Sequence, residues 1–394
     1  MMFSDKIVQN LSRSSFIRSM FEEGEKLRAK FGAENVFDFS LGNPVIEPPQ
    51  SVKDTLIKIG NQKEGGYFRY MSNAGYPAAR EAVAKSLSKD TIKPIPSSNV
   101  IMTCGAGGAL NALFKSLLNP GEEVIVFSPY FVEYGFYVEN HGGKLVVCDT
   151  NHDTFMPDLT KLESLINEKT KAIMYNSPNN PTGVLYKEET LKAMNDVLTQ
   201  AEKKYGTQIY VIADEPYVKI VYDNKKVPSV FNHFKNAISV NSFSKSLAVP
   251  GERIGYVALS NDIDQVGLLM DALIFCNRTL GYVNAPAIGQ HIVINCINES
   301  IDVGYYQKRR DLLYNAITGF GFKCIKPEGA FYLFPETPTP DDVAFVKTAQ
   351  KYNLILVPGS GFGCSGYVRL TYCLDYDMIE RSLPAFEKLA KEVL

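Results

Sequence analysis

A lysine near the middle of the chain stands in a context that would allow covalent chemistry. Lys245 lies in the segment NSFSKS, directly after an apolar run that predicts a buried strand, and Arg253 follows eight residues later in GER. An amine at a strand end can form an imine with a carbonyl compound, while Ser242, Ser244 and Arg253 can hold a phosphate beside it. Taken alone, Lys245 is better explained as a solvated lysine.

An acidic residue ends another apolar run. Asp214 follows QIYVIA and begins the segment DEPY, which also contains Tyr217. A carboxylate at the end of a buried strand is unfavourable unless it faces a cation, and a protonated pyridine nitrogen is such a cation. The segment is also compatible with a simple turn, since Asp, Glu and Pro are common turn residues.

A glycine-rich segment, TCGAGGAL, joins a predicted strand to a predicted helix and contains Gly105, Ala106 and Gly107. Such a turn presents backbone N–H groups and the positive end of a helix to a phosphate. It does not match a dinucleotide-binding motif, because Leu110 stands where the third glycine of G-x-G-x-x-G is required. The next strand also ends in a serine, Ser128, and not in an acid.

Three further residues lie in or directly after predicted strands: Asn180 in SPNNPTG, Phe131 in SPYF and Arg369 in YVRLT. A phenylalanine ring can stack on a flat heterocycle, and a planar guanidinium can bind a carboxylate through two parallel hydrogen bonds. Each residue also has an ordinary structural interpretation, as a loop asparagine, a core phenylalanine and an exposed strand arginine.

The elements that must position these residues alternate through the middle of the chain. Short β-branched runs, several of them apolar on both faces, are separated by helical patterns such as residues 109–118 and 188–205. This alternation predicts an α/β fold with a mostly parallel seven-stranded sheet flanked by helices. Ligands of such sheets bind at the carboxyl ends of the strands, where the candidate residues fall. The predicted strands are residues 99–103, 123–127, 144–148, 172–175, 208–213, 237–240 and 255–259.

The chain of 394 residues is too long for one compact core. Residues 47–284, which contain the strands, are predicted to form a large domain. The two chain ends, 1–46 and 285–394, are predicted to form one smaller α+β domain beside it. The elements expected in these ends are a helix at 16–31, an extended segment at 37–41, strands at 331–334, 355–357 and 368–371, and a closing helix at 377–393.

The composition limits the classes of function. The 41 Lys and Arg residues nearly balance 43 Asp and Glu, which argues against a basic surface for nucleic acid. The seven cysteines contain no CxxC motif and the four histidines are scattered, so neither a disulfide framework nor a metal site is expected. No segment resembles a secretory signal or a membrane span. A cytoplasmic protein that binds no metal, nucleic acid or membrane is expected.

The joint order and spacing of these motifs resemble the class I/II aminotransferases. These are fold type I enzymes that depend on pyridoxal 5'-phosphate (PLP) and are related to aspartate aminotransferase. The resemblance rests on SPNNPTG, DEPY and SFSK followed by GER, and it extends from about residue 37 to residue 369. It implies ping-pong transfer of an amino group between an L-amino acid, with aspartate as one option, and a 2-oxo acid such as 2-oxoglutarate.

The resemblance also implies a role for each motif residue. Lys245 matches the lysine that binds PLP covalently, Asp214 the carboxylate at the pyridine nitrogen, and Arg369 the clamp for the substrate's α-carboxylate. Tyr70, in RYMSNAG, matches a tyrosine that reaches the phosphate of the other subunit, which implies a homodimer with shared sites. Tyr217 and Asn180 match groups at the ring hydroxyl, Asn180 also lies near the substrate, and Phe131 matches the aromatic residue on the ring face. Gly42 matches a segment that closes over the substrate, and Pro129 and Pro181 match cis prolines. The residues that match the phosphate site are Gly105, Ala106, Gly107, Ser242, Ser244 and Arg253.

Some questions stay open at the level of the sequence. Arg278 and Arg18 are candidates for binding the distal carboxylate of a dicarboxylic substrate, but a structural salt bridge is equally compatible with each. The same fold includes carbon–sulfur β-lyases, which would use Lys245 to expel a β-leaving group and release pyruvate and ammonia. It also includes ligand-sensing regulators, which need a DNA-binding module, and the chain shows no helix-turn-helix pattern before its core.

Overall fold

The computed structural model describes the backbone of residues 4–394 and the side chains of residues 4–11 and 23–394. Its centre is a sheet of seven strands, in the spatial order β2-β8-β7-β6-β5-β3-β4. Only β8 runs antiparallel to its neighbours, so the predicted mostly parallel sheet is confirmed. The strands are β2 (Val100–Thr103), β3 (Glu123–Ser128), β4 (Lys144–Asp149), β5 (Thr170–Asn176), β6 (Tyr210–Asp214), β7 (Ala237–Ser242) and β8 (Gly255–Leu259).

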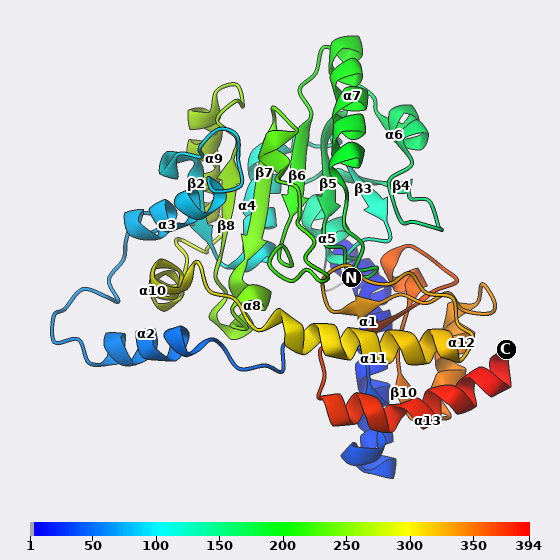
Figure 1. Ribbon diagram of the computed structural model, residues 1–394. Coiled ribbons are helices and arrows are strands. Elements are labelled where there is room, and N and C mark those ends of the chain that lie inside the picture. The colour runs from blue at the N-terminus through cyan, green and yellow to red at the C-terminus, as the bar shows by residue number, and fades with distance from the viewer. Residues whose placement is uncertain (1–3) are drawn as a thin grey trace.

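Helices cover both faces of this sheet (Figure 1). Strand β3 shows how its sequence requires this: Val124 and Val126 pack into the core on one face, and Ile125 and Phe127 into the core on the other. All four side chains are at most 3% exposed, which explains why the strands read as continuous apolar runs. The first face is covered by α4 (Gly105–Leu117), α5 (Glu133–Asn140) and α9 (Val266–Thr279), and the second by α3 (Pro77–Leu87), α6 (Leu159–Leu165), α7 (Glu188–Tyr205) and α10 (Ala287–Cys296).

The two chain ends share one hydrophobic core. Phe39, from the N-terminal end, packs edge-on against Phe386, from the last helix, with ring centroids 5.2 Å apart. Strand β1 (Phe37–Asp38) pairs in parallel with β10 (Leu354–Ile355). Other elements of the ends are α1 (Asp5–Phe31), α11 (Val303–Gly319), α12 (Asp342–Gln350), α13 (Tyr376–Val393) and an antiparallel sheet of β11 (Val357–Pro358), β12 (Val368–Thr371) and β9 (Tyr332–Leu333). The proposed domain boundaries near residues 46 and 284 stay a prediction.

Several predicted element boundaries differ from the observed ones. Helix α4 begins at Gly105, not at residue 109, because its first turn is the glycine-rich segment itself and carries no apolar side-chain pattern. Helix α1 begins at Asp5, well before the predicted residue 16. The predicted strand at 331–334 is reduced to Tyr332–Leu333, and the extended segment at 37–41 to Phe37–Asp38.

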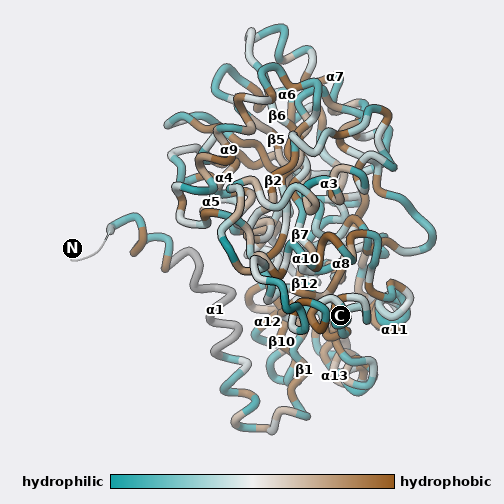
Figure 2. The backbone as a smooth tube through the Cα atoms, turned by 90° about the vertical axis from the view of Figure 1, so that its left-hand side faces the viewer, coloured by the Kyte–Doolittle hydropathy of each residue, from teal (hydrophilic) through white to brown (hydrophobic). Residues whose placement is uncertain are grey.

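The carboxyl ends of β5, β6 and β7 point toward α11, and the short helix α8 (Phe243–Ser246) lies at the end of β7 (Figure 1). Helix α2 (Gln50–Gly60) packs against α10 at the lower left of the same view. Figure 2 shows hydrophobic residues concentrated around β5 and β6, with hydrophilic residues in the outer loops. Among the described residues, every helix is too short or too polar to traverse a lipid bilayer.

Candidate active site

A cavity of about 410 Å³ lies at the carboxyl ends of β5, β6 and β7. All but two of the predicted site residues line it, and they come from segments that span most of the chain. The predicted residues on its wall are Gly42, Ala106, Gly107, Phe131, Asn180, Asp214, Tyr217, Ser242, Ser244, Lys245, Arg253 and Arg369. The two exceptions, Gly105 and Tyr70, are described below.

The register of the sheet explains why these residues meet. Asp214 is the last residue of β6 and lies opposite Asn176, the last residue of β5. Ser242 ends β7, and α8 then carries Ser244 and Lys245 into the same space. Because parallel strands end at one edge of a sheet, residues far apart in sequence share one cavity.

Asp214 is a buried carboxylate with one unsatisfied oxygen. The Tyr134 hydroxyl donates to Oδ2 at 2.5 Å, whereas Oδ1 is buried and has no hydrogen-bond partner. Burial raises the pKa of Asp214 to about 6, and the Tyr134 hydrogen bond opposes that increase. A buried acid with a free oxygen facing a cavity is suited to a cationic N–H donor, such as a protonated pyridine nitrogen.

Lys245 contacts the N-terminal segment of the chain. Its Nζ donates to the backbone carbonyl of Gly42 at 2.6 Å. Gly42 itself lies so close to Tyr332 that a Cβ at this position would overlap the Tyr332 hydroxyl group. Only glycine therefore allows this segment to pass over the cavity beside Lys245.

The other end of the cavity is suited to a phosphate. Ala106 and Gly107 lie in the first turn of α4, whose N–H groups and dipole favour an anion. Gly105 has a positive φ of 68° and does not line the cavity. A Cβ on Gly105 would lie 2.8 Å from Nη2 of Arg253, so the glycine allows the guanidinium to approach the helix end. Ser242 and Ser244 add hydroxyl groups to the same wall.

Arg369 is buried, so the interpretation as an exposed strand arginine is wrong. Two hydrogen bonds hold its side chain in place: Nη1 donates to Asn180 Oδ1 at 3.1 Å, and Nη2 donates to the Ser40 carbonyl. The guanidinium lies over the rings of Tyr332 and Phe362, 4.6 and 4.7 Å from their centroids. Burial lowers the pKa of Arg369 from its usual value. Its Nε has no partner, so an N–H remains for an anion.

Sequence reasoning missed the tyrosines that surround these groups. Phe131, Tyr134 and Tyr137 are spaced by three residues and all line the cavity, so helical spacing after SPYF could have indicated them. Tyr332 carries no such signal, because it comes from the C-terminal end of the chain. Its hydroxyl lies 3.0 Å from that of Tyr217, and burial together with Tyr332 raises the pKa of Tyr217 well above its usual range.

Besides Gly105, two predicted residues, Tyr70 and Arg278, do not line the cavity of their own chain. Tyr70 is 90% exposed and does not line it. Arg278 is exposed at the end of α9, with its guanidinium 5.5 Å from the ring centroid of Phe275. The side chain of Arg18 lies outside the described residues.

The backbone at three prolines agrees with the motif, because the bonds before Pro129, Pro178 and Pro181 are all cis. The resemblance implied the first and third. Taken together, an amine, a buried acid with a free oxygen, a stacking ring and a phosphate site fit one flat heterocycle with a phosphate at one end. The fold and the site therefore define a PLP-binding α/β enzyme.

The chain belongs to the aminotransferase class I and II family, whose model matches residues 34–386. It is a PLP-dependent aminotransferase. Its sequence is 32% identical over 362 residues to a probable aspartate aminotransferase of Methanocaldococcus jannaschii, covering 89% of this chain and 92% of that protein. It is 31% identical over 384 residues to the aspartate aminotransferase of Bacillus subtilis, covering 92% and 93%.

Solved structures agree with this assignment. An aminotransferase from Eubacterium rectale superimposes with a TM-score of 0.96 at 40% identity, over 100% of this chain and 99% of that one. The aspartate aminotransferase of Thermus thermophilus with maleate superimposes with a TM-score of 0.87 at 28% identity, over 99% and 100%.

Proposed function

We propose that Lys245, Asp214 and Arg369 are the central residues of amino-group transfer in this enzyme. The observation that carries the proposal is the convergence of Lys245 and Asp214 on one cavity, with a buried Asp214 oxygen left unpaired. Bound PLP supplies a ring that accepts the electrons released when the substrate's α-carbon loses its proton. The chain's own residues would bind and orient the ring and the substrate, and would move the protons beside them.

Asp214 would keep the ring nitrogen protonated, because a cation beside a buried carboxylate is strongly favoured where water is excluded. Tyr134 would hold Asp214 in place through its hydrogen bond. Tyr217 and Asn180 would bind the ring hydroxyl, and Phe131 would stack on the ring face. The phosphate would bind to the first turn of α4 with Ser242, Ser244 and Arg253.

Lys245 would bind the cofactor covalently in the resting enzyme and move the substrate's α-proton through its Nζ once released. Arg369 would bind the α-carboxylate, since its planar guanidinium is already held by Asn180 and by Ser40. The segment around Gly42 would close over the substrate, because it already lies against Lys245 and Tyr332.

For the amino donor, we propose aspartate as the first candidate and 2-oxoglutarate as the acceptor. The proposal rests on relatives named aspartate aminotransferase and on the Thermus thermophilus structure with maleate, a dicarboxylate. Among the described residues of one chain, the cations on the cavity wall are Lys245, Arg253 and Arg369, and each already has a role. A distal carboxylate would therefore bind to polar groups of the wall or to a group from a second subunit.

A donor panel tests this proposal. The holoenzyme is mixed with aspartate, alanine, leucine or phenylalanine, and conversion of the cofactor to its pyridoxamine form is followed by absorbance. We expect conversion by aspartate without any acceptor, and parallel double-reciprocal plots once 2-oxoglutarate is varied. If only the neutral donors converted the cofactor, aspartate would not be the amino donor of this enzyme, in contrast to what the names of its relatives indicate. Ammonia release from cysteine would instead indicate the β-lyase, which no feature of the cavity favours.

We also propose a homodimer in which Tyr70 serves the partner's phosphate site. Tyr70 is 90% exposed and Phe68, two residues earlier, is 73% exposed, which is costly for aromatic side chains unless another surface covers them. Sedimentation of the holoenzyme is expected to give twice the chain mass. In Tyr70→Phe we expect PLP to dissociate more readily, and an unchanged PLP affinity would contradict the shared site. A cytoplasmic location stays a prediction from the sequence.

A further inference from the structure

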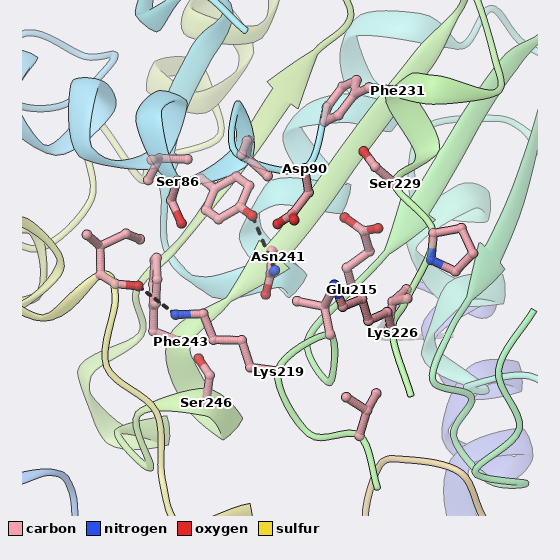
Figure 3. Close-up of a pocket in the computed structure, with 18 of the residues that line it drawn as sticks. Ser86, Asp90, Glu215, Lys219, Lys226, Ser229, Phe231, Asn241, Phe243 and Ser246 are labelled. Carbon is pink, nitrogen blue, oxygen red and sulfur yellow. Dashed lines mark hydrogen bonds between the residues drawn. The ribbon is translucent and has the colours of Figure 1, made fainter. Parts of the chain in front are cut away.

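A second cavity, of about 320 Å³, lies on the opposite face of the sheet from the active site. Its wall includes Glu215, the residue directly after Asp214. Glu215 follows β6, and its N–H still donates to the carbonyl of Val240 on β7 at 2.8 Å. The alternation of side chains therefore continues, and the two adjacent acids face opposite sides of the sheet. Glu215 is 6% exposed, and Figure 3 shows its carboxylate pointing into the space that Asp90 and Ser229 border.

Polar hydrogen bonds hold Glu215 and Asn241, two residues of the cavity wall. Ser239, on β7, donates to Glu215 Oε2 at 2.5 Å. Two residues further along β7, Asn241 donates to the Tyr256 hydroxyl at 3.2 Å (Figure 3). Burial raises the pKa of Glu215 to about 7, and the charge of Asp214 acts in the same direction. The hydrogen-bond partner of Glu215, Ser239, is neutral and supplies no counter-charge to the buried carboxylate.

The lysines on the wall of this cavity do not neutralise Glu215. Lys219 donates to the backbone carbonyls of Ile297 and Glu299, at 2.6 and 3.1 Å. Lys225 pairs with Glu328 on the outside. Neither lysine forms an ion pair with Glu215 in the described part of the chain. A carboxylate held for stability alone would normally be paired with one of the cations beside it.

Apolar side chains form most of the remaining wall, and unpaired charges stand near the opening. The apolar residues include Val83, Leu87, Val218, Phe231, Phe243 and Ile297. Asp90 and Lys226 are exposed, line the cavity and form no ion pair within the described residues. The cavity thus offers one buried acid, an apolar body and charges of both signs at its mouth, within the size range of small-molecule sites.

We propose that this cavity is a second small-molecule site that binds a primary ammonium group at Glu215, with a short apolar body between Phe231 and Phe243. Two sources share this chemistry, a simple aliphatic amine and a free apolar amino acid. Only the amino acid would also place a carboxylate near Lys226. The proposal does not depend on the identity of the enzyme's amino donor.

Binding is measured by calorimetry on holoenzyme that has been reduced with borohydride, so that the cofactor cannot react with amines. Three probes share one branched body: 3-methylbutan-1-amine, leucine, and 3-methylbutan-1-ol, which lacks the amine. We expect the amine to bind and the alcohol to bind at least tenfold more weakly. Tighter binding of leucine that is lost in Lys226→Met would identify a free amino acid as the ligand. Equal or tighter binding of the amine would identify a simple amine.

Variants separate this site from the active site and from general surface charge. Glu215→Gln keeps the acceptor for Ser239 but removes the charge, and we expect at least a tenfold loss of amine affinity. Ser86→Leu fills the cavity from α3 without touching the carboxylate, and we expect it to abolish binding. Glu163→Gln, an exposed acid on α6, is the matched control and should leave binding unchanged. Unaltered amine affinity in both Glu215→Gln and Ser86→Leu, or equal affinity for the alcohol, would overturn the proposal.

Discussion

Asp214 and Glu215 are neighbours in sequence, both are 6% exposed, and yet they serve different cavities. Burial raises the pKa of both acids, to about 6 and about 7. Asp214 accepts a hydrogen bond from Tyr134 and faces a space that also contains Lys245 and Arg369. Glu215 accepts from Ser239 and faces a space with apolar walls.

The comparison shows that a perturbed pKa does not by itself identify a catalytic acid. Burial perturbs both acids, but of the two only Asp214 shares its cavity with Lys245, with the first turn of α4 and with the buried Arg369. The convergence of several kinds of group on one space therefore supports Asp214 as the proposed catalytic acid. The following predictions test that difference, from the largest expected effect to the smallest.

The largest loss of turnover is expected for Lys245→Ala, which removes the amine from the cavity that contains Asp214. Because we propose that this amine both attaches the cofactor and moves the α-proton, we expect turnover to fall by about 10⁴-fold. Borohydride should no longer fix the cofactor to the protein, as read by mass spectrometry of the intact chain. A cofactor adduct on another lysine would end the assignment of Lys245.

Asp214→Asn preserves the shape of the side chain and removes its charge. We expect turnover to fall roughly 10²–10³-fold, because the ring nitrogen loses its counter-charge. Thermal unfolding should change little, since the amide can still accept from Tyr134. Near-normal turnover in this variant would contradict a catalytic role for Asp214 that Glu215 does not share.

Tyr134→Phe sharpens the comparison, because it removes the donor to Asp214 and keeps the ring. The hydrogen bond lowers the pKa of Asp214, so its loss should raise that pKa further and weaken the hold on the ring nitrogen. We expect about a tenfold fall in turnover, the equivalent of one hydrogen bond to a charged group. The pH profile should shift toward higher pH, whereas a purely structural role would leave its position unchanged.

Glu215→Gln should have the smallest effect on turnover and a clear effect on stability. The pKa of Glu215 is raised from 4.5 to about 7, so folding takes up a proton between these values. Its contribution to stability is thus fully present below pH 4.5 and is lost as pH rises through 7, by up to about 1.4 kcal/mol per pH unit. Urea unfolding from pH 5 to 8 should show this decline in the wild type and less of it in the variant. If the free energies of unfolding of the wild type and the variant changed in parallel with pH, Glu215 would not be a buried acid without a counter-charge.

The sequence predicted twelve residues that line the Asp214 cavity, but not the tyrosines that surround them. Lys245, Asp214 and Arg369 were recognisable because each stands in a short motif in or directly after a predicted strand. Tyr332 was not, because its contact with Tyr217 joins residues 115 positions apart, and no local pattern encodes such a pair. Arg369 was found by its motif, but its burial was not, since a strand of alternating residues does not reveal what covers each face.

The order of motifs along the chain determined the family, the cofactor and the kind of chemistry, because those depend on residue types at the ends of successive strands. The strand runs likewise determined a two-sided sheet, since apolar residues on both faces require two covering layers. Only the tertiary structure decided that Asp214 keeps a free oxygen, that the Gly42 carbonyl contacts Lys245, and that Glu215 lines a different cavity from Asp214. These features depend on which side chains from distant segments fill the space around each group, and local sequence does not specify that packing.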